Sequence, residues 1–462
     1  MVKYSACFFE RCTLKGVNNQ LIESTKRINL KTAHSYNEQQ IRAITIHIGF
    51  VISYGRMSLK HPVDTMKRIV DTNQQFFVFL HLFRLHTLNY MFLKSLHIVN
   101  YRNVVQADLG FAPKINAFIG QNGMGKTNIL DAIYYLSFCN GAVCRADQFN
   151  LNHEADFFMI QGTYEVEEGS DLTVSCSLKR GGRKHVKCDG KDYKRFSEHL
   201  GKIPLVMLSP SDSLLVSGGS EERRRFMDAV IAQYDRHYLA AIIRYERSLK
   251  QRNALLKAEA EPDAGVLDVL EEMMSADAAV IYTARAQFIE QLSPIFSDLY
   301  AKLCPNDSEQ PAIDYVSHGS RGTLKEWLSS WREKERIVGY TLHGPHKDEL
   351  ELTLGGFPMK KEASQGQTKT FFIAMKLAQY VFLHHHGHAD TPLLLLDDIF
   401  DKLDADRVAR IVDYVSGNDF GQIFITDTNR DHLDEILSAT AEDYRLFRVT
   451  NGHVCLEQKE DK

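Results

Sequence analysis

The sequence has no long apolar run, no cysteine pair at metal or redox spacing and no secretory signal. Its eight cysteines are scattered without a C-x-x-C pair, so we expect free thiols in a reducing compartment. The most apolar early stretch, residues 76–82, is too short to span a bilayer, and charged residues follow it closely. We therefore expect a cytoplasmic protein with no membrane partner.

A strong excess of positive charge is also missing. The 462 residues carry a formal net charge of −4, with 25% charged and 44% hydrophobic residues. This composition is ordinary for a soluble globular protein, and the length leaves room for two or three domains. No global basic field indicates a nucleic-acid partner, so any DNA-binding surface must be a local patch.

The first 90 residues differ from the rest of the chain. They hold 12 Lys and Arg against 5 Asp and Glu, whereas the remaining residues hold 43 against 54. They show no sustained period, and alternation typical of an edge strand begins abruptly at Met91 and continues to Tyr101. We place a domain boundary at 90/91 and favour the hypothesis that Met91 is the natural start; a peptide from residues 1–90 in mass spectra of the native protein would contradict it. A basic DNA-binding arm is the alternative.

A glycine-rich motif lies where an apolar strand meets a helical pattern. Residues 120–127 fit G-x-x-x-x-G-K-[ST], after a strand at 115–119 and before apolar residues at helical spacing over 128–136. Backbone N–H groups of such a loop cradle phosphate oxygens, and the helix N-terminus adds partial positive charge. Lys126 is predicted to reach the β- and γ-phosphates, and the Thr127 hydroxyl to ligate Mg²⁺. The predicted ATP-binding residues of this P-loop are Gly120, Gln121, Asn122, Gly123, Met124, Gly125, Lys126 and Thr127.

A second chemical signal lies at 392–398, where four leucines precede two adjacent carboxylates. A wholly apolar strand is typical of a parallel sheet that is buried on both faces, and ligands bind at the carboxyl ends of such strands. This pattern predicts a Walker B strand in which Asp397 holds Mg²⁺, directly or through water, and Asp398 acts as general base toward the attacking water. The alternative is a buried strand that merely ends at an acidic turn.

Strands with a basic turn follow the P-loop helix. The pattern predicts strands at 157–165, 172–178 and 185–188, with Gly181-Gly182 as a hairpin turn between the last two. The hairpin carries the densest basic cluster in the chain, which predicts contacts with the phosphate backbone of DNA. A solvated turn is the alternative. The predicted DNA-binding residues are Lys179, Arg180, Arg183, Lys184 and Lys187.

The middle of the chain is predicted to be helical. A long helix opens at Ser220, with that residue as its cap, and apolar residues between 239 and 256 fall close to heptad spacing. Residues 262–265 break the run, and a second helical stretch covers 266–303. We expect an antiparallel helical hairpin of about 25 residues per arm, or about 35–40 Å at 1.5 Å per residue.

Three weaker signals flank the Walker B strand. The turn Ser364-Gln365-Gly366-Gln367 precedes an expected amphipathic helix over 368–385, and a turn at a helix N-terminus is an anion site. After the strand, Asp401-Lys402-Leu403-Asp404 forms a short acidic turn. Residues 422–427 are predicted to be one more strand that ends in polar residues.

Together these motifs resemble a known family. The P-loop has the narrower form G-x-x-G-x-G-K-T, residues 364–367 resemble an ABC signature, and residues 401–404 resemble a D-loop. The combination is similar to ABC-type ATPase heads of the SMC and Rad50 class, and more closely to the RecF family of bacterial recombination mediators. The resemblance covers residues 91–462 and none of 1–90. The runs that carry it are Leu96–Asn103, the P-loop helix, Gly218–Asp228, His343–Asp348, Ser364–Gln367 and Leu395–Asp398.

The resemblance implies an α/β fold, a P-loop ABC-type ATPase head with a mixed sheet, flanking helices and a second helical lobe that carries a short antiparallel arm. Lobe I would comprise 91–200 with Walker A and 390–462 with Walker B, and lobe II would comprise 201–389 with the arm and the signature. ATP would lie between two subunits, with the signature of one subunit meeting the γ-phosphate held by Lys126 of the other. The implied ATP contacts in that signature are Ser364, Gln365, Gly366 and Gln367.

The resemblance also implies a function in recombinational repair and replication-fork maintenance. The dimer would close on ATP, clamp DNA at single-strand gaps or junctions, help to load recombinase and open on slow, DNA-stimulated hydrolysis. The implied partners are double-stranded, single-stranded and gapped DNA, a second copy of the chain, and RecR- and RecO-type mediator proteins. ATP and Mg²⁺ are the implied cofactors.

The chain departs from the ABC pattern at several positions. Transporter ATPases place Glu after the Walker B Asp and His at the switch, where this sequence has Asp398 and Asp427. The D-loop begins with Asp401-Lys402, which leaves Asp404 as its expected cross-subunit contact, and no Q-loop glutamine can be placed. An ABC transporter-type ATPase subunit is the alternative function, and these departures argue against it.

Overall fold

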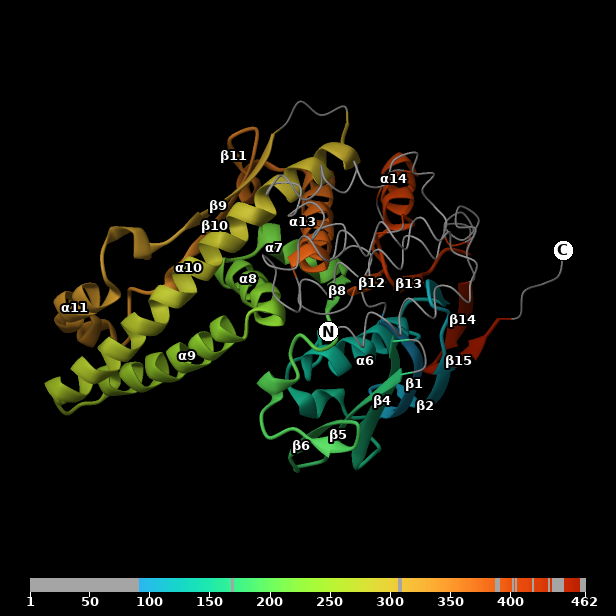
Figure 1. The fold of residues 1–462 in the computed structure, drawn as a ribbon, viewed down its shortest axis with the longest axis horizontal. Coiled ribbons are helices and arrows are strands. Elements are labelled where there is room, and N and C mark those ends of the chain that lie inside the picture. Colours follow the sequence, from blue (N-terminus) through green and yellow to red (C-terminus); the bar gives the residue numbers. More distant parts are fainter. Residues whose placement is uncertain are drawn as a thin grey trace, which may run out of the picture. The chain divides into compact units, whose positions relative to one another are not determined.

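The computed structural model describes residues 91–457 except 168–169, 306–309, 387–390, 401–402, 404, 418, 431–432 and 434–443 (Figure 1). The expected extension 1–90 and its boundary at 90/91 lie outside the described residues, as do Asp401, Lys402 and Asp404 of the acidic turn. Within the described part, no helix is long and apolar enough to cross a membrane.

The first of two large sheets is antiparallel, in the order β2-β1-β4-β5-β6-β7. Strands β1, β4, β5 and β6 lie where the sequence predicts strands, but β1 lies between β2 and β4 and is not at an edge. Alternating apolar and polar residues show only that one face of a strand meets solvent. An interior strand of an open antiparallel sheet has such a face too, so the pattern does not identify an edge strand. The strands are β1 (Phe92–Tyr101), β2 (Val104–Gly110), β4 (Phe157–Glu167), β5 (Ser170–Lys179), β6 (Lys184–Cys188) and β7 (Lys191–Asp192).

The second sheet carries the P-loop, in the order β15-β14-β3-β13-β12-β8. Neighbouring strands are parallel from β14 to β8, and β15 is antiparallel to β14, so the sheet is mixed as expected. Helix α6 (Lys126–Phe138) leaves β3 and lies between the two sheets (Figure 1). The strands are β3 (Ile115–Ile119), β8 (Leu205–Leu208), β12 (Leu393–Asp397), β13 (Ile423–Asp427), β14 (Tyr444–Thr450) and β15 (His453–Leu456).

The run of leucines in β12 is explained by two cores, one on each face of the mixed sheet. Leu393 and Leu395 belong to the core shared with α6 and the antiparallel sheet. Leu394 and Leu396 belong to the core shared with the helices of the second half of the fold. Because successive side chains of a strand point to opposite faces, a strand with a core on both sides needs an apolar residue at every position.

Strand β8 comes from the segment that the sequence assigned to lobe II. It pairs in parallel with β12, from Leu205 opposite Leu393 to Leu208 opposite Leu396. One strand of the 201–389 segment therefore completes the P-loop sheet. The division into lobes otherwise stays a prediction.

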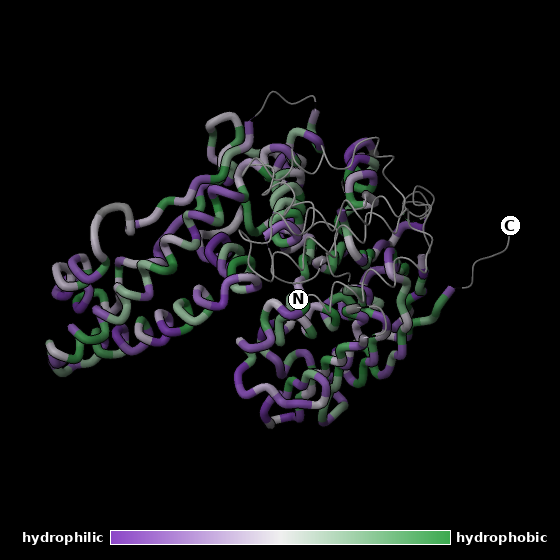
Figure 2. Tube along the Cα trace, in the orientation of Figure 1, coloured by the Kyte–Doolittle hydropathy of each residue, from purple (hydrophilic) through white to green (hydrophobic). Residues whose placement is uncertain are grey.

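The helical segment begins with α8 (Ser220–Tyr234), whose N-cap is Gly219. Ser220 is thus the first helical residue rather than the cap, and its hydroxyl donates to the carboxylate of Glu349. The predicted long helix is broken at Asp235, which caps α9 (Arg236–Lys257) by accepting hydrogen bonds from two backbone N–H groups. Helix α10 (Ala264–Leu303) returns along α9, so the hairpin has arms of 22 and 40 residues instead of about 25 each. Hydrophilic and hydrophobic positions alternate along both arms (Figure 2).

The remaining elements of this half frame the predicted signature. A three-stranded sheet has the order β11-β10-β9. Helix α13 starts at Gln365 and is buried on nearly all sides, so the expectation of an amphipathic helix was wrong. Apolar residues around the whole helix are typical of a helix inside a large core. The elements are β9 (Pro311–Val316), α11 (Leu324–Val338), β10 (Glu349–Leu354), β11 (Phe357–Pro358), α12 (Met359–Glu362), α13 (Gln365–His386) and α14 (Ala405–Val415).

The buried side chain of Gln422 joins the two sheets. Its Oε1 accepts from the Leu93 N–H at 2.8 Å, and its Nε2 donates to the carbonyls of Leu93 and Ala112 at 3.0 and 2.8 Å. Gln422→Leu would leave these buried backbone groups without that partner, so we expect the free energy of unfolding to fall by about 1–3 kcal/mol in urea titrations. Gln379→Leu is the control, since the buried Oε1 of Gln379 has no hydrogen-bond partner among the described residues. Equal losses in both variants would contradict the prediction.

Candidate nucleotide site

The P-loop joins β3 to α6 by a turn that only glycines fit. Gly123 and Gly125 have φ of 80° and 109°, in the left-handed region that side chains rarely adopt. A Cβ on Gly120 would lie 2.4 Å from the Val449 carbonyl oxygen. The loop therefore turns tightly and exposes its backbone N–H groups at the N-terminus of α6, which is the arrangement that binds phosphate.

Lys126 is held inside this loop. Its Nζ donates to the carbonyl oxygens of Gly120 and Gln121 at 2.7 and 3.2 Å. Burial lowers the pKa of Lys126, and three carboxylates oppose that shift. Those carboxylates are Asp398, Asp397 and Asp427, so the structure gathers the predicted Walker B acids and the switch residue around the P-loop lysine.

Asp397 meets the P-loop directly. The Thr127 hydroxyl donates to its carboxylate, with both oxygens at 3.0 Å, across 270 positions of sequence. The Thr426 hydroxyl donates to the same carboxylate at 2.7 Å from the neighbouring strand β13. Burial raises the pKa of Asp397, and these two hydrogen bonds work against the rise because they stabilise the carboxylate.

A hydroxyl and a carboxylate placed in this way fit Mg²⁺. The ion prefers oxygen ligands, keeps several waters and commonly takes only one or two carboxylates from the protein. Thr127 and Asp397 supply such a pair beside a phosphate cradle. In the described part of the chain, no group of three or more His, Cys, Asp or Glu side chains could hold a metal on its own.

Asp398 leaves the strand in an unusual direction. Its φ is +48°, in the left-handed region that Asp and Asn tolerate better than other side chains. Its N–H donates to the hydroxyl and the carbonyl of Thr426 at 3.0 and 3.2 Å. This backbone turn separates the two adjacent acids, so Asp397 remains in the buried strand while Asp398 is only partly buried.

Asp427 ends β13 at the same edge of the sheet. Its Oδ1 accepts from the Asn429 N–H at 2.8 Å, and its side chain is buried. The sequence analysis placed it at the switch position, and the structure puts it among the acids that act on Lys126.

The predicted signature turn forms the start of α13. The Ser364 hydroxyl accepts from the Gln367 N–H at 3.2 Å, and the Gln367 side chain accepts from the Ser364 N–H at 2.7 Å. This reciprocal pair is a capping box. Ser364 and Gln365 are exposed, and a Cβ on Gly366 would lie 3.3 Å from a guanidinium nitrogen of Arg407 in α14. The turn thus presents an exposed helix N-terminus.

The sequence did not predict the contacts that two distant segments make with the backbone of the P-loop. The Met124 carbonyl accepts from the Gly452 N–H at 2.8 Å and from the Asn103 side chain at 3.2 Å. Gly452, in the turn between β14 and β15, has no room for a side chain, since a Cβ there would lie 2.0 Å from the Asn103 carbonyl oxygen. The glycine in Asn451-Gly452 is a turn signal in the sequence, but nothing local shows that the turn faces the P-loop.

A further missed element follows β8. Ser209 N–H donates to Asp212 at 2.7 Å in a short capped turn, and Lys376 of α13 lies 3.6 Å from the Asp212 carboxylate. Because β8 neighbours β12, this turn lies at the carboxyl edge that carries Asp397. The Ser209–Asp212 turn therefore connects the carboxyl edge of the P-loop sheet to α13. No Q-loop glutamine that could make this connection can be placed from the sequence.

The basic hairpin is only partly available to DNA. The Arg180 guanidinium donates to three carbonyls, those of residues 152, 153 and 155. Lys184 is largely buried, 2.9 Å from Asp147, and its ammonium lies over the Tyr135 and Phe196 rings. Lys179, Arg183 and Lys187 are exposed, and Lys187 makes only a long 3.9 Å pair with Asp192. Arg180 and Lys184 thus have partners within the chain, and the DNA contact of the hairpin stays a prediction.

The hydrogen bond from Thr426 gives a testable pH dependence. Mg²⁺ needs the Asp397 carboxylate, so we expect Mg–ATP affinity to fall as pH drops through the raised pKa of Asp397. Thr426→Val removes a bond that lowers this pKa, so the acid limb of the affinity profile should move to higher pH. Thr426→Ser keeps the hydroxyl and should retain the wild-type profile. Calorimetric titration at several pH values measures the shift, and identical Val and Ser profiles would contradict the assignment.

Comparisons with known proteins agree with this geometry. The family model for the RecF/RecN/SMC N terminal domain matches residues 92–454. A DNA replication and repair protein RecF from Phocaeicola vulgatus is 53% identical over 370 residues, which cover 80% of this chain and 99% of that protein. The protein of the same name from Bacteroides thetaiotaomicron is 52% identical over 362 residues, which cover 78% and 98%.

Solved structures show the same likeness. A structure of the recombination mediator protein RecF with ATP, in the RecFOR pathway, has a TM-score of 0.73 and 26% identity, and the match covers 81% of this chain and 99% of that one. A second, described as RecF-ATPrS, has a TM-score of 0.72 and 25% identity, with coverage of 81% and 100%.

Proposed function

The chain belongs to the RecF family of ABC/SMC-class ATPases, and from this premise we propose that it is an ATP-switched clamp on DNA in recombinational repair. Family membership carries the coarser statement, that this is a DNA-repair ATPase. The finer proposal is that ATP closes a dimer, that the closed dimer holds DNA at gaps or junctions and helps to load recombinase, and that slow hydrolysis releases it.

The observation that supports this proposal most directly is the meeting of the two halves of the site. The Thr127 hydroxyl and the Asp397 carboxylate come from opposite ends of the described chain and lie 3.0 Å apart. This contact supports a single nucleotide site within one chain, made of the P-loop cradle and the Walker B edge with Lys126 beside both. Ser364 belongs to an exposed turn, where a second copy of the chain could reach it.

The proposed roles follow from the chemistry of each side chain. The P-loop N–H groups and Lys126 stabilise charge on the phosphates, and Lys126 must exchange its bonds to Gly120 and Gln121 for phosphate oxygens. Thr127 and Asp397 would hold Mg²⁺, which supplies charge neutralisation between the β- and γ-phosphates when bound. Asp398 orients and deprotonates the attacking water. Asp is one methylene shorter than Glu, so its carboxylate lies farther from an in-line water and turnover is slow.

The partners are proposed from the relatives. The solved RecF structures are described as a recombination mediator in the RecFOR pathway. We extend this to RecO- and RecR-type partners and to DNA for this chain. On the DNA side, the exposed cations of the hairpin are Lys179, Arg180, Arg183 and Lys187. Because the Arg180 guanidinium already donates to three backbone carbonyls, Lys179, Arg183 and Lys187 are the ones proposed to meet phosphates. The transporter-type alternative has no observation in its favour.

We also propose that the working ATPase begins at Met91. The family model starts at residue 92, and curated relatives are covered over 98–99% of their own length by 78–80% of this chain. Mass spectrometry of the native protein tests this start, because a peptide from residues 1–90 would contradict it.

Asp398→Asn should separate binding from turnover. Asn tolerates the left-handed backbone at this position, so the local fold should survive. The variant should bind ATP, dimerise and retain DNA, while hydrolysis slows further, because a general base contributes about 10²–10⁴-fold. A DNA-retention assay in ATP, run beside a turnover assay, measures both. Loss of DNA binding together with hydrolysis would make Asp398 a metal or structural residue and remove the slow-release part of the proposal.

Ser364→Arg should block ATP-driven dimerisation and leave ATP binding by the monomer nearly intact. A bulky cation would replace a small hydroxyl that must approach the γ-phosphate held by the other subunit. Ser364→Thr is the control, because it keeps the hydroxyl that caps α13. Sedimentation with and without ATP measures the dimer. If Ser364→Arg dimerises on ATP as well as the wild type does, the composite site is wrong.

A further inference from the structure

Helix α9 carries an exposed basic stripe that the nucleotide site does not use. Seven residues recur at alternating intervals of four and three positions, which places them on one face of the helix. All seven are exposed and none is acidic. We call them the α9 stripe: Arg236, Ala240, Ile243, Arg247, Lys250, Ala254 and Lys257.

The cations of the α9 stripe have no partner in the part of the chain that the structure describes. The other two arginines of the helix differ: Arg244 pairs with Asp277 at 2.6 Å, and buried Arg252 pairs with Glu271 at 2.9 Å. Both of those arginines pair with acids of α10, whereas the cations of the stripe are unpaired among the described residues. An unpaired row of this kind favours a negatively charged partner.

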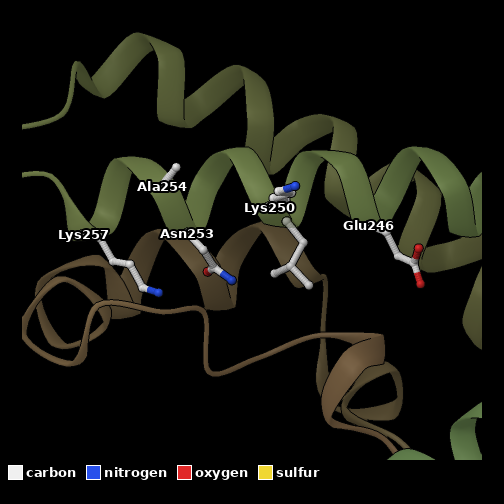
Figure 3. A pocket seen from close by; sticks show the side chains of 6 residues that line it. Glu246, Lys250, Asn253, Ala254 and Lys257 are labelled. Atoms are coloured by element: carbon white, nitrogen blue, oxygen red, sulfur yellow. The ribbon is translucent and has the colours of Figure 1, made fainter. Parts of the chain in front are cut away.

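A groove runs beside the stripe, between α9 and the segment after α11. Its volume is about 500 Å³, and Figure 3 shows the side chains of α9 that line it. Asn253 accepts from the Thr341 N–H at 2.8 Å, and a Cβ on Gly339 would lie 3.4 Å from the Lys257 side chain, so the turn at 339–341 lies against this side of α9. The lining residues on α9 are Glu246, Leu249, Lys250, Asn253, Ala254 and Lys257.

Exposed apolar side chains flank Gly339, at the start of the turn that lies against α9. Ile337 is 84% exposed, Val338 45% and Tyr340 44%. The Lys347 ammonium lies 5.1 Å from the centre of the Tyr340 ring, so a further cation lies beside these apolar side chains. We call Ile337, Val338 and Tyr340 the apolar ridge. All three lie within four residues at and just beyond the C-terminus of α11, and a cluster of exposed apolar side chains favours a protein contact.

We propose that the α9 stripe, the groove and the apolar ridge form one docking surface for an acidic amphipathic helix of a partner protein. Carboxylates of that helix pair with Arg247, Lys250 and Lys257, and its apolar side chains enter the groove and cover the ridge. The stripe spans 22 residues of helix, or about 33 Å at 1.5 Å per residue, so it matches a partner helix of about 20 residues.

The apolar ridge distinguishes this partner from duplex DNA. Phosphate contacts are made by cations and hydrogen-bond donors and need no apolar seat. Helix recognition, in contrast, uses apolar anchors at intervals of three and four residues. Glu246 at one end of the groove would also repel a phosphate backbone, whereas a peptide can place a neutral or basic residue there. The proposal concerns a surface outside the ATP site and does not rest on the clamp model.

The test uses the full chain and a labelled synthetic helical peptide of about 20 residues, with Leu at intervals of three and four and Glu elsewhere. Fluorescence anisotropy measures its binding to the wild type, to the triple variant Arg247→Glu, Lys250→Glu and Lys257→Glu, and to the double variant Ile337→Ser and Tyr340→Ser. We expect the triple variant to bind about tenfold or more weakly and the double variant to bind several-fold more weakly. ATP turnover and thermal melting should be unchanged in both.

The charge-matched control is the triple reversal of Lys179, Arg183 and Lys187, which should bind the peptide as the wild type does. A peptide with Ser in place of Leu should bind more weakly, because it lacks the apolar anchors. The proposal is overturned if neither peptide binds, if both bind equally and the double variant changes nothing, or if duplex DNA displaces the peptide and loses its own binding in the α9 triple variant. The last result would assign the surface to nucleic acid.

Discussion

The contact between Thr127 and Asp397 is the constraint on which the rest of the fold depends. A hydroxyl and a carboxylate separated by 270 positions must stay 3.0 Å apart, so two strands from distant parts of the chain must belong to one parallel sheet. Thr426, on the strand between them, donates to the same carboxylate at 2.7 Å and accepts from the Asp398 N–H. The environment of the buried Asp397 carboxylate is therefore set by three adjacent strands, β3, β13 and β12. Displacement of any one of these strands would change the position of the carboxylate and its pKa.

The intervening helical segment is tied to this sheet rather than appended to it. Strand β8 extends the sheet, and the turn after β8 places Asp212 3.6 Å from Lys376 of the signature helix. Farther out, Arg285 of α10 is buried and bonds to Asp228 of α8 and to Asp348 next to β10, at 2.8 and 3.1 Å. Polar contacts thus join the P-loop sheet to α13, and join α10 to α8 and to the start of β10.

Local patterns in the sequence predicted the elements whose formation depends on residues close together in the chain. The strand, turn and helix around Lys126, the Walker B strand and the basic hairpin all follow from spacing within a few residues, and the structure has these elements. What local patterns could not show depends on distant contacts. Arg180 and Lys184 bond to backbone carbonyls and to an acid that are distant in the sequence, so the pattern of the hairpin could not show that these cations are paired. In the same way, α13 is buried on nearly all sides because other helices surround it, which its own sequence pattern did not reveal. Likewise, the contacts of Gly452 and Asn103 with the P-loop depend on tertiary packing that no motif records.

The order in which the chain is made has a consequence for folding. The core that contains α6 also needs Leu395 of β12, Phe424 of β13 and Phe447 of β14. These residues follow Phe118 in the same core by about 280 to 330 positions, which at ribosomal speeds of 5–20 residues per second is on the order of 15–65 s of synthesis. Once β7 has been made, the nascent antiparallel sheet and α6 carry an apolar face that lacks these three strands until each of them is synthesised. Newly made chains are therefore exposed to aggregation and to chaperone binding for much of their synthesis, and a ribosome that stops before β14 releases a product that cannot close its core.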